Sequence, residues 1–127
     1  MTNQEYVAAA LKTETLDLDG IRNRVTPITI RLLHGALGLA GEAGEFADAI
    51  KKHVFYGAPC DMTNLIEELG DILWYCVVVM DTLDLTFEEV QKKNVAKLQQ
   101  RYGGAFSLEK VLNRDTAAER EALEKGR

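Results

Sequence analysis

The chain has few cysteines and no long apolar segment. Cys60 and Cys76 are the two cysteines among 127 residues, and they match neither a metal-binding spacing nor a disulfide framework. We expect free thiols in a reducing compartment. The longest wholly apolar run, residues 72–80, has nine residues, whereas a helix needs about 20 to cross a bilayer. With no basic-then-apolar N-terminus either, the sequence predicts a cytoplasmic protein without signal peptide or membrane anchor.

The sequence also lacks an excess of positive charge. Lysine and arginine total 15 against 20 aspartates and glutamates, so the formal net charge is −5. A general binder of nucleic acid or of anionic membranes needs a positive field to attract phosphates, and we expect neither partner. The length of 127 residues, with 46% hydrophobic and 28% charged residues, predicts one globular domain over 1–127.

Several familiar catalytic motifs are missing. The chain contains no phosphate-binding GxxxxGK[ST] loop, no nucleophile-elbow serine and no Cys-His arrangement that spacing would support. Neither His34 nor His53 stands three residues after a glutamate, which is the pattern of ferritin-like di-iron bundles. Covalent catalysis and di-iron redox chemistry are therefore not indicated.

Helical signals dominate the sequence, and strand signals are nearly absent. Capping-box patterns at residues 2–5 and 86–89 predict helix starts, and Pro27 after Thr26 is well placed as the first residue of another helix. The expected helices run from about 3 to between 13 and 19, from 27 to 53 or 54, from 63 or 64 to 83, and from 87 to about 102. A polar, irregular stretch is expected over 14–25, and the tail over 105–127 should form a short helix from about 116 with a frayed end at 125–127.

Two carboxylate pairs with helical spacing are the strongest functional signal. Glu42 and Glu45 form one pair and Glu68 and Asp71 the other, each within a predicted helix. Residues three apart lie on one face of a helix, so each pair directs two carboxylates the same way. If the two helices pack together, four acids share one volume, and their repulsion favours hard cations such as Mg²⁺ or Mn²⁺. The spacing predicts a divalent-metal site.

The same segments carry a family resemblance. Glu42-Ala-Gly-Glu45, a 22-residue gap, and Glu68-Leu-Gly-Asp71 read as ExxE followed by ExxD, and a third element follows at residues 93–102. Three elements in this order resemble the MazG-like family of all-α nucleoside triphosphate pyrophosphohydrolases, over about residues 34–102. The resemblance implies an all-α, four-helix-bundle-like fold that hydrolyses nucleoside or deoxynucleoside triphosphates to the monophosphate and pyrophosphate, with Mg²⁺ held by the four acids.

A stripe of polar side chains follows the third element. Asn94, Lys97 and Arg101 fall within about 60° of one another on a helix. The resemblance maps these residues and Tyr102 onto the phosphate-binding element of the family, and lysine and arginine suit phosphate oxygens. A solvated charged face is the alternative for the stripe, and Tyr102 shares a face with Val95 and Leu98, which is typical of a core residue.

Four further residues are candidates with open alternatives. Glu67 shares the acidic stripe and would be a further ligand, a residue that orients ligands, a base acting on metal-bound water, or a solvated acid. Tyr75 lies one turn beyond Asp71, where an aromatic residue in relatives lies against the nucleobase; it is otherwise a core aromatic. Lys52 and His34 lie near the acid face. Each would contact the substrate, unless Lys52 only pairs with Asp48 and His34 only packs.

The apolar run over residues 72–80 also predicts association. Its side chains surround the whole helix, and such a helix must be covered on all sides. A chain with about four helices has few neighbours to provide that cover. We therefore expect a homodimer or a dimer of dimers, with each active site near the subunit boundary. A regulatory protein that binds metal and nucleotide without turnover, and a structural helical module, remain the alternatives to an enzyme.

Overall fold

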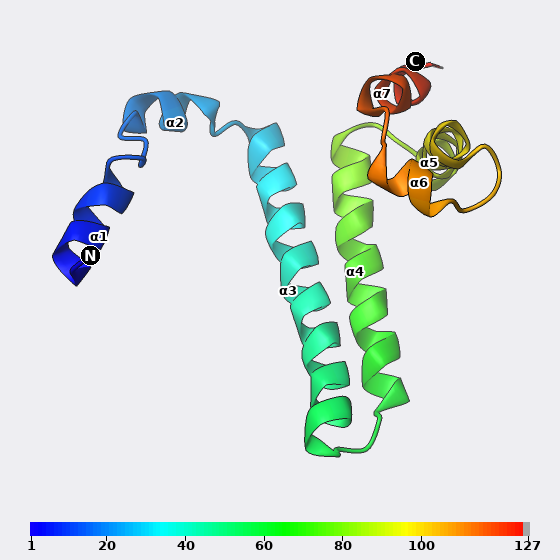
Figure 1. Cartoon of the computed structure of the whole chain (residues 1–127), viewed down its shortest axis with the longest axis horizontal. Coiled ribbons are helices and arrows are strands. Elements are labelled where there is room, and N and C mark those ends of the chain that lie inside the picture. Colours follow the sequence, from blue (N-terminus) through cyan, green and yellow to red (C-terminus); the bar gives the residue numbers. More distant parts are fainter. Residues whose placement is uncertain (126–127) are drawn as a thin grey trace.

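Seven α-helices make up the part of the chain that the computed structural model describes, residues 1–125 (Figure 1). No strand occurs within these residues. The helices are α1 (Asn3–Leu11), α2 (Leu18–Arg24), α3 (Pro27–Tyr56), α4 (Met62–Thr82), α5 (Phe87–Tyr102), α6 (Leu108–Leu112) and α7 (Thr116–Glu124). The expected all-α class is confirmed.

Local capping chemistry fixes most of the helix ends. Thr2, Thr26 and Thr86 each accept a hydrogen bond from a backbone N–H in the first turn, and the residue three positions later bonds back to the cap. At the other end, Gly57 closes α3 and Gly103 closes α5 in the left-handed conformation, which costs glycine little. These boundaries lie within three residues of the predicted ones.

Two short helices differ from the sequence prediction. The stretch expected to be irregular contains α2, where Asp17 accepts a hydrogen bond from Gly20 N at 3.0 Å. The tail contains α6, where Ser107 caps Lys110 N. Both helices are too short for hydrophobic periodicity to be visible, so only their caps mark them. The predicted helix from Thr116 is confirmed as α7, while the predicted fraying at residues 126–127 lies outside the described residues.

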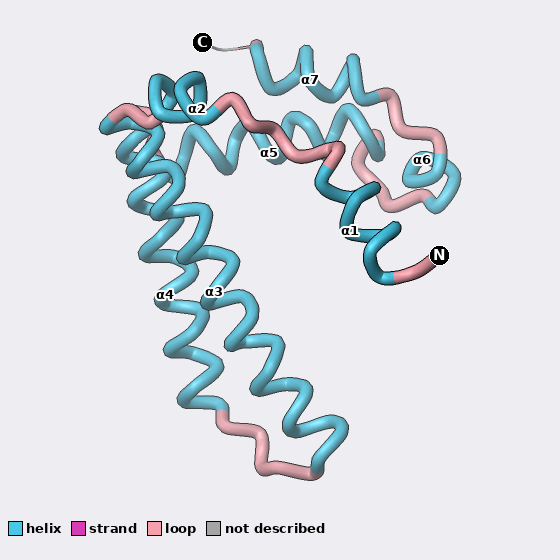
Figure 2. Tube along the Cα trace, turned by 90° about the vertical axis from the view of Figure 1, so that its left-hand side faces the viewer, coloured by secondary structure: helices cyan, strands magenta, loops and turns pink. Residues whose placement is uncertain are grey.

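The helices α3 and α4 form an antiparallel hairpin that is the structural centre of the chain. They run side by side along most of their length, joined by a short loop at one end (Figure 2). Glycines on α3 permit this close approach: a β-carbon at Gly35 would overlap Val79, and one at Gly38 would overlap the Tyr75 ring. The register of α3 against α4 is therefore set by two contacts, in which Gly35 faces Val79 and Gly38 faces Tyr75.

We expect Gly38→Ala to destabilise the hairpin by about 1–3 kcal/mol, because the added methyl group must displace the Tyr75 ring. Gly70→Ala is the matched control, since Gly70 lies in α4 and a β-carbon there meets nothing within 4 Å. Replacing that glycine should stabilise the helix by up to about 1 kcal/mol. Chemical denaturation of both variants measures the difference, and equal stabilities would contradict the close-packing interpretation.

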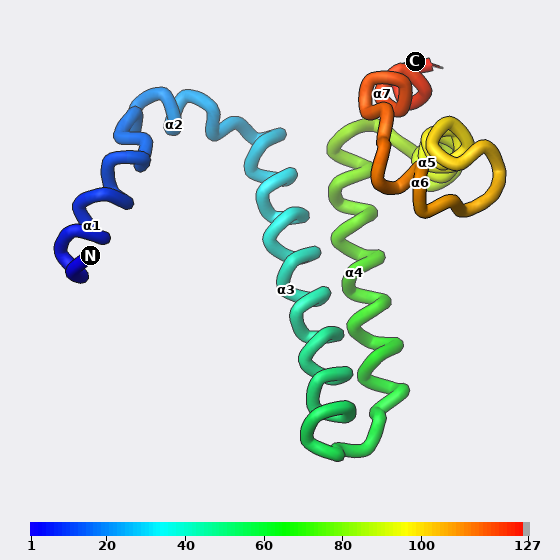
Figure 3. Tube along the Cα trace, viewed as in Figure 1, coloured from blue at the N-terminus to red at the C-terminus, as the bar shows by residue number. Residues whose placement is uncertain are grey.

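The C-terminal helices form a second, smaller cluster at the end of α4. Following the chain from blue to red in Figure 3 shows α5 leaving the end of α4 and α7 returning beside α5. Lys93 on α5 donates a hydrogen bond to Leu123 O at 2.8 Å, close to the end of α7. The main packing pairs are thus α3 with α4 and α5 with α7, so the described residues of one chain do not complete a four-helix bundle.

The N-terminal helices form an arm that extends away from the hairpin (Figure 1). Neither α1 nor α2 packs extensively on another described helix, and the arm exposes Tyr6, Val7 and Leu11. Burial is sparse elsewhere too: Met80 is the one buried apolar side chain among the described residues. None of the helices described here is both long enough and apolar enough to span a membrane.

Candidate metal and nucleotide site

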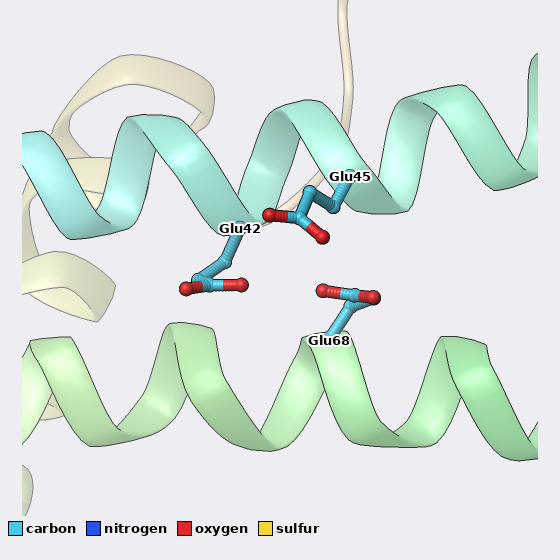
Figure 4. Close-up of side chains that lie close together, drawn as sticks. All are labelled: Glu42, Glu45 and Glu68. Atoms are coloured by element: carbon cyan, nitrogen blue, oxygen red, sulfur yellow. The ribbon is translucent and has the colours of Figure 1, made fainter.

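Three of the four predicted metal ligands meet between α3 and α4. Glu42 and Glu45 project from α3 and Glu68 from α4, with their carboxylates facing one another (Figure 4). One carboxylate oxygen from each residue lies within 4.8 Å of the others. The hairpin therefore brings together two acids separated by a single turn and a third from the facing helix, as the ExxE and ExxD spacing predicted.

Burial and like charge make this cluster unfavourable without a counterion. Glu68 is only 7% exposed, although it is a glutamate. The pKa of Glu42 is raised from its ordinary value of 4.5, first by its partial removal from water and then by the charges of Glu45 and Asp71 and by its interaction with Glu68. A raised carboxyl pKa means that the ionised form is disfavoured, which a bound cation would reverse.

Asp71, the fourth acid of the motif, and the neighbouring Glu67 lie outside the trio. Asp71 is exposed and lies outside the group within 4.8 Å, but its charge contributes to the raised pKa of Glu42. Glu67 is also exposed and outside that group. The geometry thus separates a central trio from two exposed acids.

The chemistry of the trio fits a hard divalent cation. All its donor atoms are carboxylate oxygens, which Mg²⁺ and Mn²⁺ prefer, and no cysteine or histidine belongs to the group that would favour a softer metal. Mg²⁺ usually binds through a few carboxylates while it keeps several waters, so three acids on one side leave positions for water and for phosphate oxygens.

A cavity of about 460 Å³ opens beside the trio, toward the loop that joins α3 to α4. Glu45 and Glu68 line it together with small residues and with Lys52 and Asn64. Lys52 Nζ lies 2.8 Å from Asp48 Oδ2, and Lys51 pairs with the same carboxylate. These hydrogen bonds, first from Lys51 and then from Lys52, hold the pKa of Asp48 at about 2, and Asp48 raises the pKa of Lys52. The predicted ion pair is confirmed, and Lys52 also faces the cavity.

Three aromatic rings cluster on the hairpin. The His34 ring lies edge-on to Tyr75 with 5.6 Å between centroids, and Trp74 lies 4.8 Å from Tyr75 and 6.1 Å from His34. His34 comes from α3, whereas the other two come from α4. His34 and Tyr75 were predicted as site residues from the sequence, whereas Trp74, which is 54% exposed, was not. Its position next to Tyr75 in the sequence was the signal from which Trp74 could have been predicted.

Arg101, at the C-terminal end of the polar stripe of α5, binds α7. Arg101 donates from Nε to Glu119 Oε1 at 2.8 Å and from Nη2 to Oε2 at 2.5 Å, and Arg114 donates to the same two oxygens at 3.2 and 2.8 Å. Glu119 is 4% exposed. Lys97 is half-buried with no ion pair among the described residues, and Asn94 is exposed. The spacing placed Arg101 on the stripe correctly but gave no sign of its partner 18 residues later.

Stability should depend on pH through Glu119. Its pKa is lowered from 4.5 to about 2, first by hydrogen bonds from Arg101 and then by those from Arg114. A lowered carboxyl pKa contributes stability above pH 4.5, and this contribution is lost as the pH falls toward 2. We expect Glu119→Gln to be less stable than the unmodified chain at pH 6 and nearly as stable at pH 2.5, as measured by thermal unfolding. A difference that is constant with pH would contradict this role.

Comparison with known proteins points to one family. A family model described as the MazG nucleotide pyrophosphohydrolase domain matches residues 33–106. The Gene 37 protein of Mycobacterium phage L5 is 36% identical over 75 residues, which make up 55% of this chain and 65% of that relative. The chain thus spans less than two thirds of that relative's length. No solved structure matches significantly. The family match includes the acid trio and the stripe of α5 but ends before α6 and α7.

Proposed function

The chain belongs to the MazG nucleotide pyrophosphohydrolase domain family, and we propose that it hydrolyses nucleoside or deoxynucleoside triphosphates to the monophosphate and pyrophosphate. The observation that supports this proposal is the carboxylate trio of Glu42, Glu45 and Glu68 beside a cavity. Hydrolysis of a phosphoanhydride needs charge neutralisation and a positioned water, and a divalent cation held by these carboxylates would supply both. A role in control of the nucleotide pool, in the cytoplasm, is part of the proposal.

The proposed site divides into three regions. Glu42, Glu45, Glu68 and Asp71 would hold Mg²⁺, for which Mn²⁺ is a chemical substitute. The bound cation would neutralise phosphate charge and lower the pKa of a coordinated water. Glu67, which is exposed and lies outside the trio, would accept a proton from water or orient a ligand.

Other side chains would position the substrate. The proposed phosphate contacts are Lys97, Asn94, Lys52 and Arg101, of which Arg101 must first exchange its bonds to Glu119 and Lys52 its pair with Asp48. Tyr75 and His34 offer ring faces and edges to a nucleobase, and Trp74 adjoins both. Since Arg101 is paired with α7 within one chain, its access to the acid trio would depend on a second subunit or on movement of α7.

A pyrophosphate-release assay tests the proposal. The purified chain is incubated with common and damaged nucleoside triphosphates and Mg²⁺, and the products are identified. The proposal expects monophosphate and pyrophosphate in equal amounts. If nucleotides and Mg²⁺ bind but no pyrophosphate appears, the chain is a binding protein without turnover. If Mg²⁺ causes no thermal shift, the chain is a structural helical module in which the acids bind no metal.

A further inference from the structure

Asn64 stands apart from the family motif but contacts one of its acids directly. Its Nδ2 atom donates a hydrogen bond of 2.7 Å to Glu68 Oε1, one helical turn further along α4. Asn64 is half-buried and lines the same cavity as Glu45 and Glu68. Asn64 is not one of the acids of the trio, so its amide is well placed to set the direction of the Glu68 carboxylate from outside.

The backbone around Asn64 is itself held in place. Asp61 caps α4 by accepting hydrogen bonds from Thr63 N at 3.0 Å and from Asn64 N at 3.1 Å. The preceding loop is tied to α3, because His53 Nδ1 lies 2.8 Å from Ala58 O and Ala58 N donates to Lys52 O at 3.2 Å. These hydrogen bonds restrain the backbone of the loop and of the first turn of α4. The Cα position of Asn64, from which its side chain reaches Glu68, is therefore well defined.

We infer that Asn64 is a positioning residue that holds Glu68 in the orientation needed to bind the divalent cation. This inference rests on the proposed function, since it assigns a task to Asn64 only if the trio binds metal. Because Glu68 Oε1 accepts from the amide, rotation of the carboxylate is restricted, and its other oxygen would bind the cation. Residues that hydrogen-bond to metal ligands typically change metal affinity by 10–100-fold when they are replaced.

Charge explains why an amide suits this position. Glu68 already shares its surroundings with Glu42 and Glu45, so an acid at position 64 would add repulsion, and a lysine would neutralise the carboxylate that must attract a cation. The amide group supplies a donor without net charge. It orients Glu68 while leaving the negative charge of the trio available for the metal.

The test compares Asn64→Leu with Thr63→Ala as a matched control. Leucine keeps a similar size but cannot donate a hydrogen bond, whereas Thr63 is exposed on the same turn and contributes only its backbone N–H to the cap. Mn²⁺ binding to the metal-free chain is measured by electron paramagnetic resonance, and thermal unfolding is followed without metal. We expect Asn64→Leu to weaken Mn²⁺ binding at least about 10-fold, with little change in the metal-free unfolding midpoint, and Thr63→Ala to bind like the unmodified chain.

Two other outcomes overturn the inference. Unchanged Mn²⁺ affinity in Asn64→Leu would show that Glu68 needs no orienting donor, while the proposed metal site itself would stand. A lower metal-free midpoint with unchanged affinity would assign Asn64 a purely structural role. Failure of the unmodified chain to bind Mn²⁺ would instead overturn the proposed function, so the two failures are distinguishable. Turnover of Asn64→Leu should also need more Mg²⁺ to reach half of its maximum.

Discussion

Replacing Glu45 by glutamine is expected to lower triphosphate turnover at least about 100-fold while the helices remain folded. Glutamine keeps the size of the side chain but removes a charge from the trio that faces the cavity. A catalytic cation contributes several kcal/mol of transition-state stabilisation, and each 1.36 kcal/mol is a factor of ten in rate. Steady-state kinetics with Mg²⁺ and circular dichroism of the same preparation measure the two properties.

Two further variants make this first prediction specific. Asp71→Asn tests the acid that lies outside the trio but influences Glu42, and we expect a comparable loss of activity if it completes the metal site. Glu88→Gln is a control, since Glu88 pairs with Lys92 on the exposed surface of α5. Near-normal Mg²⁺-dependent activity in Glu45→Gln would show that the metal site is assigned wrongly. Relief of repulsion should also make the metal-free Glu45→Gln chain slightly more stable.

The second large effect concerns association: we expect light scattering at micromolar concentration to give a mass of at least two chains. The accessible surface of the chain is 10,235 Å², whereas a compact monomer of 14.1 kDa should expose about 6,700 Å². The difference, about 3,500 Å² per chain, is large enough for the interface of an obligate oligomer, which buries about 2,000 to more than 5,000 Å² over both partners. A four-helix bundle would form if two α3–α4 hairpins paired through their exposed apolar faces.

A substitution on α4 tests whether the chains associate through the α3–α4 hairpin. Leu73 on α4 is 48% exposed within one chain and lies near the start of the apolar run over residues 72–80. Leu73→Asp should lower the mass to that of one chain and greatly reduce stability, because an unpaired carboxylate would enter a buried interface. A chain of 14.1 kDa with full activity would contradict the association and leave the acid trio unaffected.

The features that the sequence predicted well are those encoded locally. Threonine caps, Pro27 and the closing glycines lie within a few residues of the ends they determine, so helix boundaries were readable. The acid trio was predictable for a related reason, because two helical faces and one short connection leave few ways to pack. The sequence predicted that Asp71 would join the other three acids, but its carboxylate lies outside their group, and this depends on side-chain direction.

Partners from distant segments were much less predictable. Helical periodicity placed Asn94, Lys97 and Arg101 on one stripe, but it could not reveal that Glu119 lies against Arg101. That contact depends on the path of the loop after α5, and hydrophobic periodicity does not predict the path of a loop. The contact of Asn64 with Glu68 is local, yet it was missed because one asparagine on a helix carries no distinctive pattern.

The free-standing arm has a consequence for how the N-terminal residues exist in solution. Isolated helices shorter than about 12–15 residues are marginal in water, and α1 has nine residues and α2 seven. Their order must therefore be conditional on contact with another surface. Without such a surface, the backbone amides of residues 3–24 should exchange hydrogen with solvent as freely as those of a random coil. Slow hydrogen exchange in the arm would therefore indicate that another protein surface covers it.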